Sequence, residues 1–102
     1  MIVVRNVFRL KFGKAKEAVA LMKEGMAIQN RLMGGGQGYS TRVLTDVTGP
    51  FYTLVLEITA PNLATFETNA PKMFGDKEWQ AHYQKVSALV ESGYREVFSV
   101  VE

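Results

Sequence analysis

The feature that most constrains the fold of this chain is a set of four segments in which apolar side chains recur at every second residue. These segments span residues 2–12, 39–47, 51–60 and 94–101, and all four contain β-branched or aromatic residues. A period of two places successive side chains on opposite sides of an extended backbone, so each segment predicts a β-strand. Residues 48–50 form the turn sequence Thr-Gly-Pro, which predicts an antiparallel hairpin between the second and third strands.

Between the strands, apolar residues recur at spacings of three and four, which is the period of an α-helix. Residues 14–33 predict a long helix that ends at the glycine-rich stretch 34–38, because glycine accepts the left-handed conformation found after helix ends. Residues 61–70 predict a short helix ended by a proline, and residues 76–93 predict a further helix from an aspartate cap to a glycine stop. Gly25 lowers helix stability by about 1 kcal/mol relative to alanine, so we expect it to mark close packing against a neighbour.

The elements therefore follow the order β-α-β-β-α-β along the chain. This order is that of the ferredoxin-like α+β fold, a four-stranded antiparallel sheet with its helices on one face. A chain of 102 residues is long enough for one such domain and too short for two, so we expect a single domain over residues 1–102.

The sheet face turned away from the helices is rich in apolar residues for a surface in contact with water. The apolar residues that we expect there are Val3, Val7, Phe51, Val55, Val97 and Val101. The charged residues that we expect among them are Arg5, Arg9, Glu57 and Arg95. Exposing this surface would lose several kcal/mol at roughly 25 cal/mol per Å2. We therefore expect a two-fold homodimer packed sheet to sheet, the alternative being a monomer with an apolar surface.

The composition excludes several classes of protein. The chain has no Cys and one His, which excludes disulfides, a thiolate metal site and a multi-His zinc site, and we expect no metal. A formal net charge of +2 is too small to indicate binding to nucleic acid or to an anionic membrane. No apolar stretch approaches the roughly 18 residues that cross a bilayer, and the N-terminal residues do not resemble a signal peptide. We therefore expect a cytoplasmic protein with neither nucleic acid nor a membrane as its partner.

Asn6 and His82 are the two candidates for chemistry. Asn6 is the polar residue in an otherwise apolar strand row, so it either orients a substrate oxygen or bonds to a neighbouring backbone group. His82 shares a helix face with Trp79 and Tyr83, which is compatible with a general base beside an aromatic wall, although aromatic residues on a helix more often belong to the core. The alternative is that Trp79 and Tyr83 belong to the core and that His82 lies in water at the boundary.

The chain resembles the dimeric α+β barrel superfamily over essentially its whole length, in its element order and its two apolar sheet faces. That superfamily includes antibiotic-biosynthesis mono-oxygenase-like proteins, haem-degrading mono-oxygenases and NIPSNAP-like proteins. Residues 6–17, NVFRLKFGKAKE, resemble the first strand and helix start of the mono-oxygenases, which carry a catalytic Asn there that Asn6 matches. The haem-degrading enzymes also use a Trp well before the His, whereas Trp79 is three residues from His82. The resemblance therefore implies cofactor-independent chemistry rather than haem oxygenation, and we expect no cofactor.

These observations predict a pocket between sheet and helices for a small hydrophobic or aromatic molecule. Asn6 and His82 are the predicted catalytic residues. The residues predicted to contact the substrate are Phe8, Leu54, Phe66, Phe74, Trp79 and Tyr83. We expect a small homodimeric mono-oxygenase-like enzyme, and the alternative is a non-catalytic ligand-binding or assembly module.

Arginine side chains offer a second kind of ligand site. The arginines predicted to lie on the sheet are Arg5, Arg9, Arg42 and Arg95. They could bind an anionic substrate, but arginines on a sheet face more often pair with neighbouring acids. We therefore expect them to pair with carboxylates such as Glu57 and Glu96.

Overall fold

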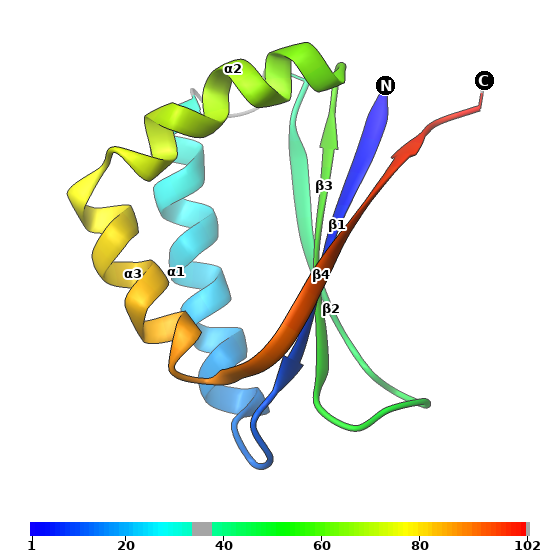
Figure 1. Cartoon of the computed structure of the whole chain (residues 1–102), viewed down its shortest axis with the longest axis vertical. Coiled ribbons are helices and arrows are strands. Elements are labelled where there is room, and N and C mark those ends of the chain that lie inside the picture. Colours follow the sequence, from blue (N-terminus) through cyan, green and yellow to red (C-terminus); the bar gives the residue numbers. More distant parts are fainter. Residues whose placement is uncertain (34–37, 102) are drawn as a thin grey trace.

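The computed structural model describes residues 1–33 and 38–101, and over these ranges it forms one layer of helices against one sheet (Figure 1). The elements are β1 (Ile2–Leu10), α1 (Ala15–Met33), β2 (Ser40–Thr45), β3 (Thr53–Ala60), α2 (Leu63–Phe74), α3 (Lys77–Ser87) and β4 (Val90–Ser99). The predicted ferredoxin-like α+β fold is confirmed, with two helices between β3 and β4. Most of the glycine-rich stretch lies outside the described residues. None of the helices in the described ranges is long and apolar enough to cross a membrane.

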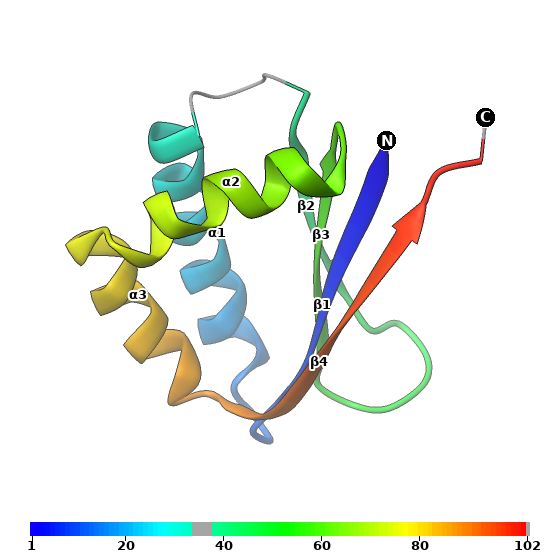
Figure 2. The same cartoon turned by 45° about the horizontal axis from the view of Figure 1, so that its top comes forward.

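The four strands form one antiparallel sheet in the order β2-β3-β1-β4. Strand β1 is therefore an inner strand, and it pairs with β3 on one side and with β4 on the other. Residue Asn6 of β1 lies opposite Leu56 of β3 and Arg95 of β4. All three helices lie on the same side of this sheet, as the two views in Figures 1 and 2 agree.

The core fills the space between the sheet and α1, and it follows from the alternation of the strands. The members of the main buried cluster are Leu10, Ala18, Met22, Leu54, Val86 and Leu89. Leu10 and Leu54 come from the sheet rows that face the helices, and Ala18 and Met22 lie one turn apart on α1. Burying each of the larger side chains, such as Leu54 and Met22, contributes about 1.5–3 kcal/mol and so favours the packing of α1 on the sheet.

The pairing of β4 corrects the prediction for the outer sheet face. Val97 lies opposite Val4, so it faces the helices, whereas Phe98 lies opposite Val3 on the outer face. Val3 and Val55 do lie on the outer face, as predicted, because their rows alternate with the buried rows. Four residues predicted for the outer face lie elsewhere. Phe51 precedes β3, Val101 follows β4, and Arg95 and Val97 face the helices. Alternation separates two rows of β4, and only its pairing with β1 decides which row faces the helices.

Two helix ends differ from the sequence prediction. Helix α2 contains Pro71 and continues to Phe74, because the turn after the proline still closes through the Gly75 N–H to the Pro71 carbonyl at 3.0 Å. Helix α3 ends at Ser87, and Gly93 lies within β4 rather than at the helix end. A side chain at position 93 would lie 3.0 Å from a β1 carbonyl, so this glycine permits close approach within the sheet.

The outer face of the sheet carries ion pairs among its apolar residues. Glu57 of β3 pairs with Arg42 of β2 at 2.7 Å and with Arg5 of β1 at 3.6 Å. The predicted pairing of these two arginines with Glu57 is therefore confirmed. The outer-face residues Tyr94 and Phe98 are 62% and 46% exposed, so this face of the single chain presents aromatic surface to water.

Candidate functional site

A cleft of about 940 Å3 lies on the helix side of the sheet, where α1 and α3 stand over β1 and β4. Helix α3 packs mainly against α1, so the sheet below it is not completely covered. The residues that line the cleft are Asn6, Phe8, Met22, Gly25, Met26, Gln29, Leu56, Phe74, Trp79, Gln80, His82, Tyr83, Gln84, Val86, Ser87, Val90, Tyr94 and Arg95. Most of the lining is apolar or aromatic, which is typical of sites for small organic molecules.

The polar end of the cleft is formed by neighbouring residues of β1 and β4. The Nε atom of Arg95 donates a hydrogen bond to Oδ1 of Asn6 over 2.7 Å. The register of the sheet causes this contact, because the two residues are direct partners across the strands. The guanidinium also lies 5.7 Å from the ring centre of Phe66 in α2, at a distance where a cation and an aromatic ring attract. The side chain of Asn6 therefore bonds to the side chain of Arg95 and not to a neighbouring backbone group, which was the alternative role predicted for it.

His82 is buried where α3 meets α1. Only 6% of its surface is exposed, and a methyl group placed on Gly25 would lie 2.6 Å from its Nε2 atom. The expected close packing at Gly25 is thus present, and its partner is the histidine. The Nδ1 atom of His82 is buried with no hydrogen-bond partner among the described residues. The ring of Trp79 lies 5.6 Å from the imidazole, measured between centres, on the same helix face.

Burial is the main cause that lowers the pKa of His82 below its ordinary value. The carboxylate of Glu24 opposes this shift, and the ammonium group of Lys85 adds to it. The charged form is disfavoured because an imidazolium between packed helices loses its hydration. The side chain is therefore neutral near pH 7, which is the form that can accept a proton.

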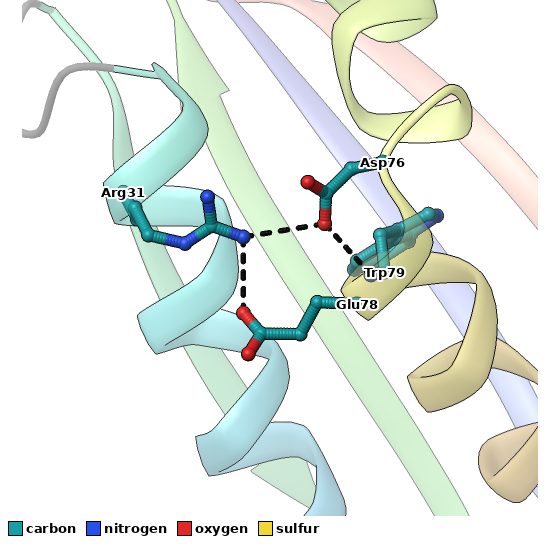
Figure 3. A network of polar contacts seen from close by, with 4 residues as sticks. All are labelled: Arg31, Asp76, Glu78 and Trp79. Atoms are coloured by element: carbon teal, nitrogen blue, oxygen red, sulfur yellow. Dashed lines mark hydrogen bonds and ion pairs between the residues drawn. The ribbon is translucent and has the colours of Figure 1, made fainter.

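A small polar network joins the start of α3, the helix that carries His82, to α1 (Figure 3). Asp76 caps α3 by accepting a hydrogen bond from the backbone N–H of Trp79 at 2.9 Å. Arg31 of α1 donates to the same carboxylate at 3.2 Å and to Glu78 at 3.0 Å. The hydrogen bond to Glu78 raises the pKa of Arg31 above its ordinary value; burial opposes this shift, and the Asp76 carboxylate adds to it. The predicted aspartate cap is therefore confirmed, and an arginine joins it to the neighbouring helix.

The structure brings most of the predicted site residues to one place. Those that line the cleft are Asn6, Phe8, Phe74, Trp79, His82 and Tyr83. Leu54 is completely buried in the core beneath α1, and Phe66 packs near Arg95 without lining the cleft. The alternative prediction, with Tyr83 in the core and His82 in water, is wrong for both residues. His82 is buried, and Tyr83 is 58% exposed.

Arg95 is the main residue of the site for which the sequence pattern predicts the wrong face of the sheet. It was expected on the outer face, paired with an acid such as Glu96, and it lies instead beside Asn6 on the helix side. Glu96 faces the other way, opposite Arg5. No ion pair joins Arg95 to a carboxylate within residues 1–33 and 38–101. Only the strand register could have revealed this placement. The same residues contain no cluster of three or more potential metal ligands.

Comparison with solved structures identifies proteins of the same fold. A NIPSNAP family protein from Agrobacterium tumefaciens has a TM-score of 0.85 at 24% identity, over 99% of this chain and 86% of its own. A putative antibiotic biosynthesis mono-oxygenase from Deinococcus radiodurans has a TM-score of 0.72 at 12% identity, over 100% and 94%. A mutant of SnoaB, a cofactor-independent oxygenase from Streptomyces nogalater, has a TM-score of 0.72 at 14% identity, over 99% and 93%. These likenesses bear out the predicted resemblance at the level of the fold. Neither protein-family models nor curated protein sequences give a match to this chain.

Proposed function

We propose that the cleft binds a small hydrophobic or aromatic molecule, and that the protein is a homodimeric, cofactor-independent mono-oxygenase-like enzyme. The observation that carries this proposal is that one cleft touches both Asn6 on β1 and His82 on α3. These residues are 76 positions apart in the chain, and a filled core would have separated them. The volume of about 940 Å3 lies within the range of natural ligand sites, roughly 300–1,000 Å3.

The two polar residues would have different tasks in such a reaction. Because Oδ1 of Asn6 accepts the bond from Arg95, the amide Nδ2 is the group that remains to donate to a substrate oxygen. The neutral imidazole of His82 would accept or relay a proton from the bound molecule. The aromatic side chains of Phe8 and Trp79 would hold the ring of the substrate away from water. The fold shared with a cofactor-independent oxygenase agrees with this assignment.

A second candidate is a ligand-binding protein without catalysis, and one feature of His82 favours it. Its Nδ1 is buried and its Nε2 faces the backbone of α1 at Gly25, as expected of a residue that packs two helices. A catalytic base needs a nitrogen within hydrogen-bond reach of the substrate. Turnover measurements therefore have to decide between the two candidates.

The homodimer of the proposal would cover the outer sheet face. The exposed rings of Tyr94 and Phe98 lie on that face beside Val7 and Val3, and exposed aromatic surface of this kind is typical of an interface between chains. Arg5 and Arg42 share the Glu57 carboxylate on this face and Glu96 lies opposite Arg5, so charges of both signs are present to pair across a two-fold interface. Apart from Tyr94, which lies on the edge strand β4 and also borders the cleft, the site lies on the opposite side of the sheet, so each subunit would keep its own cleft.

A thermal-shift screen with small aromatic compounds tests the binding part of the proposal. Compounds that bind the folded protein raise its unfolding temperature by mass action. We expect the shift to disappear in Met26→Trp, which fills the cleft, and to persist in the matched control Val47→Trp on an exposed loop. Equal shifts in both variants would place the binding elsewhere and contradict the proposal.

Oxygen consumption with the compounds that bind tests the catalytic part. For an enzyme of the proposed kind, Asn6→Ala and His82→Ala should each lower kcat by roughly 10²- to 10⁴-fold while the compound still binds. Binding without oxygen consumption by the unaltered protein would favour the non-catalytic candidate instead.

A further inference from the structure

The charge of the cleft is set by one residue. Among its lining residues, Arg95 is the only one with a formal charge at neutral pH, because burial keeps His82 neutral and the lining contains no Asp, Glu or Lys. A single cation in a largely apolar cleft favours a ligand with a matching negative charge. It also disfavours a cationic ligand, which would be placed beside a like charge.

The other four arginines of the chain already have protein partners. Arg5 and Arg42 pair with Glu57, and Arg31 pairs with Asp76 and Glu78. Arg9 donates to the carbonyl oxygen of Phe51 at 2.8 Å. Arg95 differs because its one hydrogen bond within the described chain is the bond from Nε to the neutral Asn6.

The contacts of Arg95 hold its guanidinium and leave its two Nη groups without an acceptor within residues 1–33 and 38–101. The bond to Asn6 occupies Nε at 2.7 Å, and Phe66 lies 5.7 Å from the central carbon. The Nη groups together carry four N–H donors, and the Nδ2 amide of Asn6 is available beside them. A planar guanidinium with free donors matches the two oxygens of a carboxylate.

We infer that the ligand of this cleft is an aromatic or apolar carboxylate and that Arg95 binds its carboxylate group, an inference that rests on the proposed small-molecule function. A monoanion balances the single positive charge of the lining, whereas a phosphate dianion would exceed it. The aromatic lining then receives the rest of the molecule, on the side of Trp79 and Phe8.

Calorimetric titration with 2-naphthoate and 2-naphthamide tests the inference, because the two probes share one ring system and differ in charge. We expect naphthoate to bind at least about tenfold more tightly than the amide. In Arg95→Gln, naphthoate binding should weaken by roughly ten- to a hundredfold while amide binding changes less than about threefold. Arg95→Lys should fall between, because it keeps the charge and loses the planar pair of donors. The single Trp79 lines the cleft, so its indole N–H signal in NMR should shift with both probes.

Arg9→Gln is the matched control, since it removes an arginine on the other face of the sheet. Equal binding of the two probes, or equal weakening of both by Arg95→Gln, would overturn the inference while the cleft remained a small-molecule site. Tighter binding of 2-naphthyl phosphate than of naphthoate would also overturn it. Failure of every probe to shift the Trp79 signal would overturn both this inference and the proposed function. If Arg95→Gln does not fold, the unaltered protein supplies the test. Raising the salt concentration from roughly 20 to 500 mM should then weaken the binding of naphthoate and leave the binding of the amide unchanged.

Discussion

Replacing Gly25 with alanine tests how closely α1 and α3 are packed at the site. A Cβ atom at this position would lie 2.6 Å from Nε2 and 3.2 Å from Cε1 of His82, which is closer than such atoms normally approach. Alanine improves helix propensity by about 1 kcal/mol, whereas forcing a methyl group into a packed contact costs roughly 1–3 kcal/mol. The imidazole is buried between α1 and α3, and moving it into the cleft would break this packing, so we expect the clash to dominate. Gly25→Ala should lower the free energy of unfolding by up to about 2 kcal/mol.

A double-mutant cycle with His82→Ala separates the two effects. Once the imidazole is removed, the clash is absent and the same Gly25→Ala change should raise the free energy of unfolding by about 1 kcal/mol. Urea denaturation followed by circular dichroism measures all four free energies, at one fixed protein concentration because association alters apparent stability. A rise of equal size in both backgrounds would show that the helices meet without needing a glycine, and it would refute the packing argument.

Three further changes test other parts of the structure. Burial lowers the pKa of His82, so on acidification the imidazole takes up a proton in the unfolded chain at a higher pH than in the folded protein. The contribution of His82 to the free energy of unfolding should therefore be fully present above about pH 6.5 and decrease below it. Denaturation at pH 7.5 and about 5.5 should show a smaller fall in His82→Gln, and an equal fall would contradict the shift. Phe98→Asp should convert the proposed dimer into folded monomers of 11.4 kDa, as measured by sedimentation, whereas the control Val47→Asp on an exposed loop should remain dimeric. A Phe98→Asp protein that is still dimeric would exclude the outer face as the interface. Asp76→Ala should destabilise the protein by about 1 kcal/mol through loss of the α3 cap, while Asp76→Asn retains most of the stability, a difference that thermal unfolding measures.

The local pattern of the sequence was sufficient for most elements and for part of the site. The alternation in β1 placed Asn6 on the helix side, because a one-residue shift would have moved all its apolar neighbours to the other face. The spacing of Trp79, His82 and Tyr83 placed them together on one helix. The aspartate before that helix correctly marked its first turn. Each of these predictions depends on residues close together in the chain, where backbone geometry alone fixes the relation between side chains.

Tertiary structure decided the features that join distant segments. The pairing of β4 with β1 set Arg95 beside Asn6, although the alternation of β4 is equally compatible with the opposite assignment. The contact between α1 and α3 made Gly25 and His82 neighbours and buried the histidine that the pattern could also place in water. The sequence by itself determined which side chains share a strand row or a helix face, because that follows from the periods of the backbone. Only the tertiary structure decided which rows and faces meet, because strand register and helix docking depend on packing between segments that are far apart in the chain.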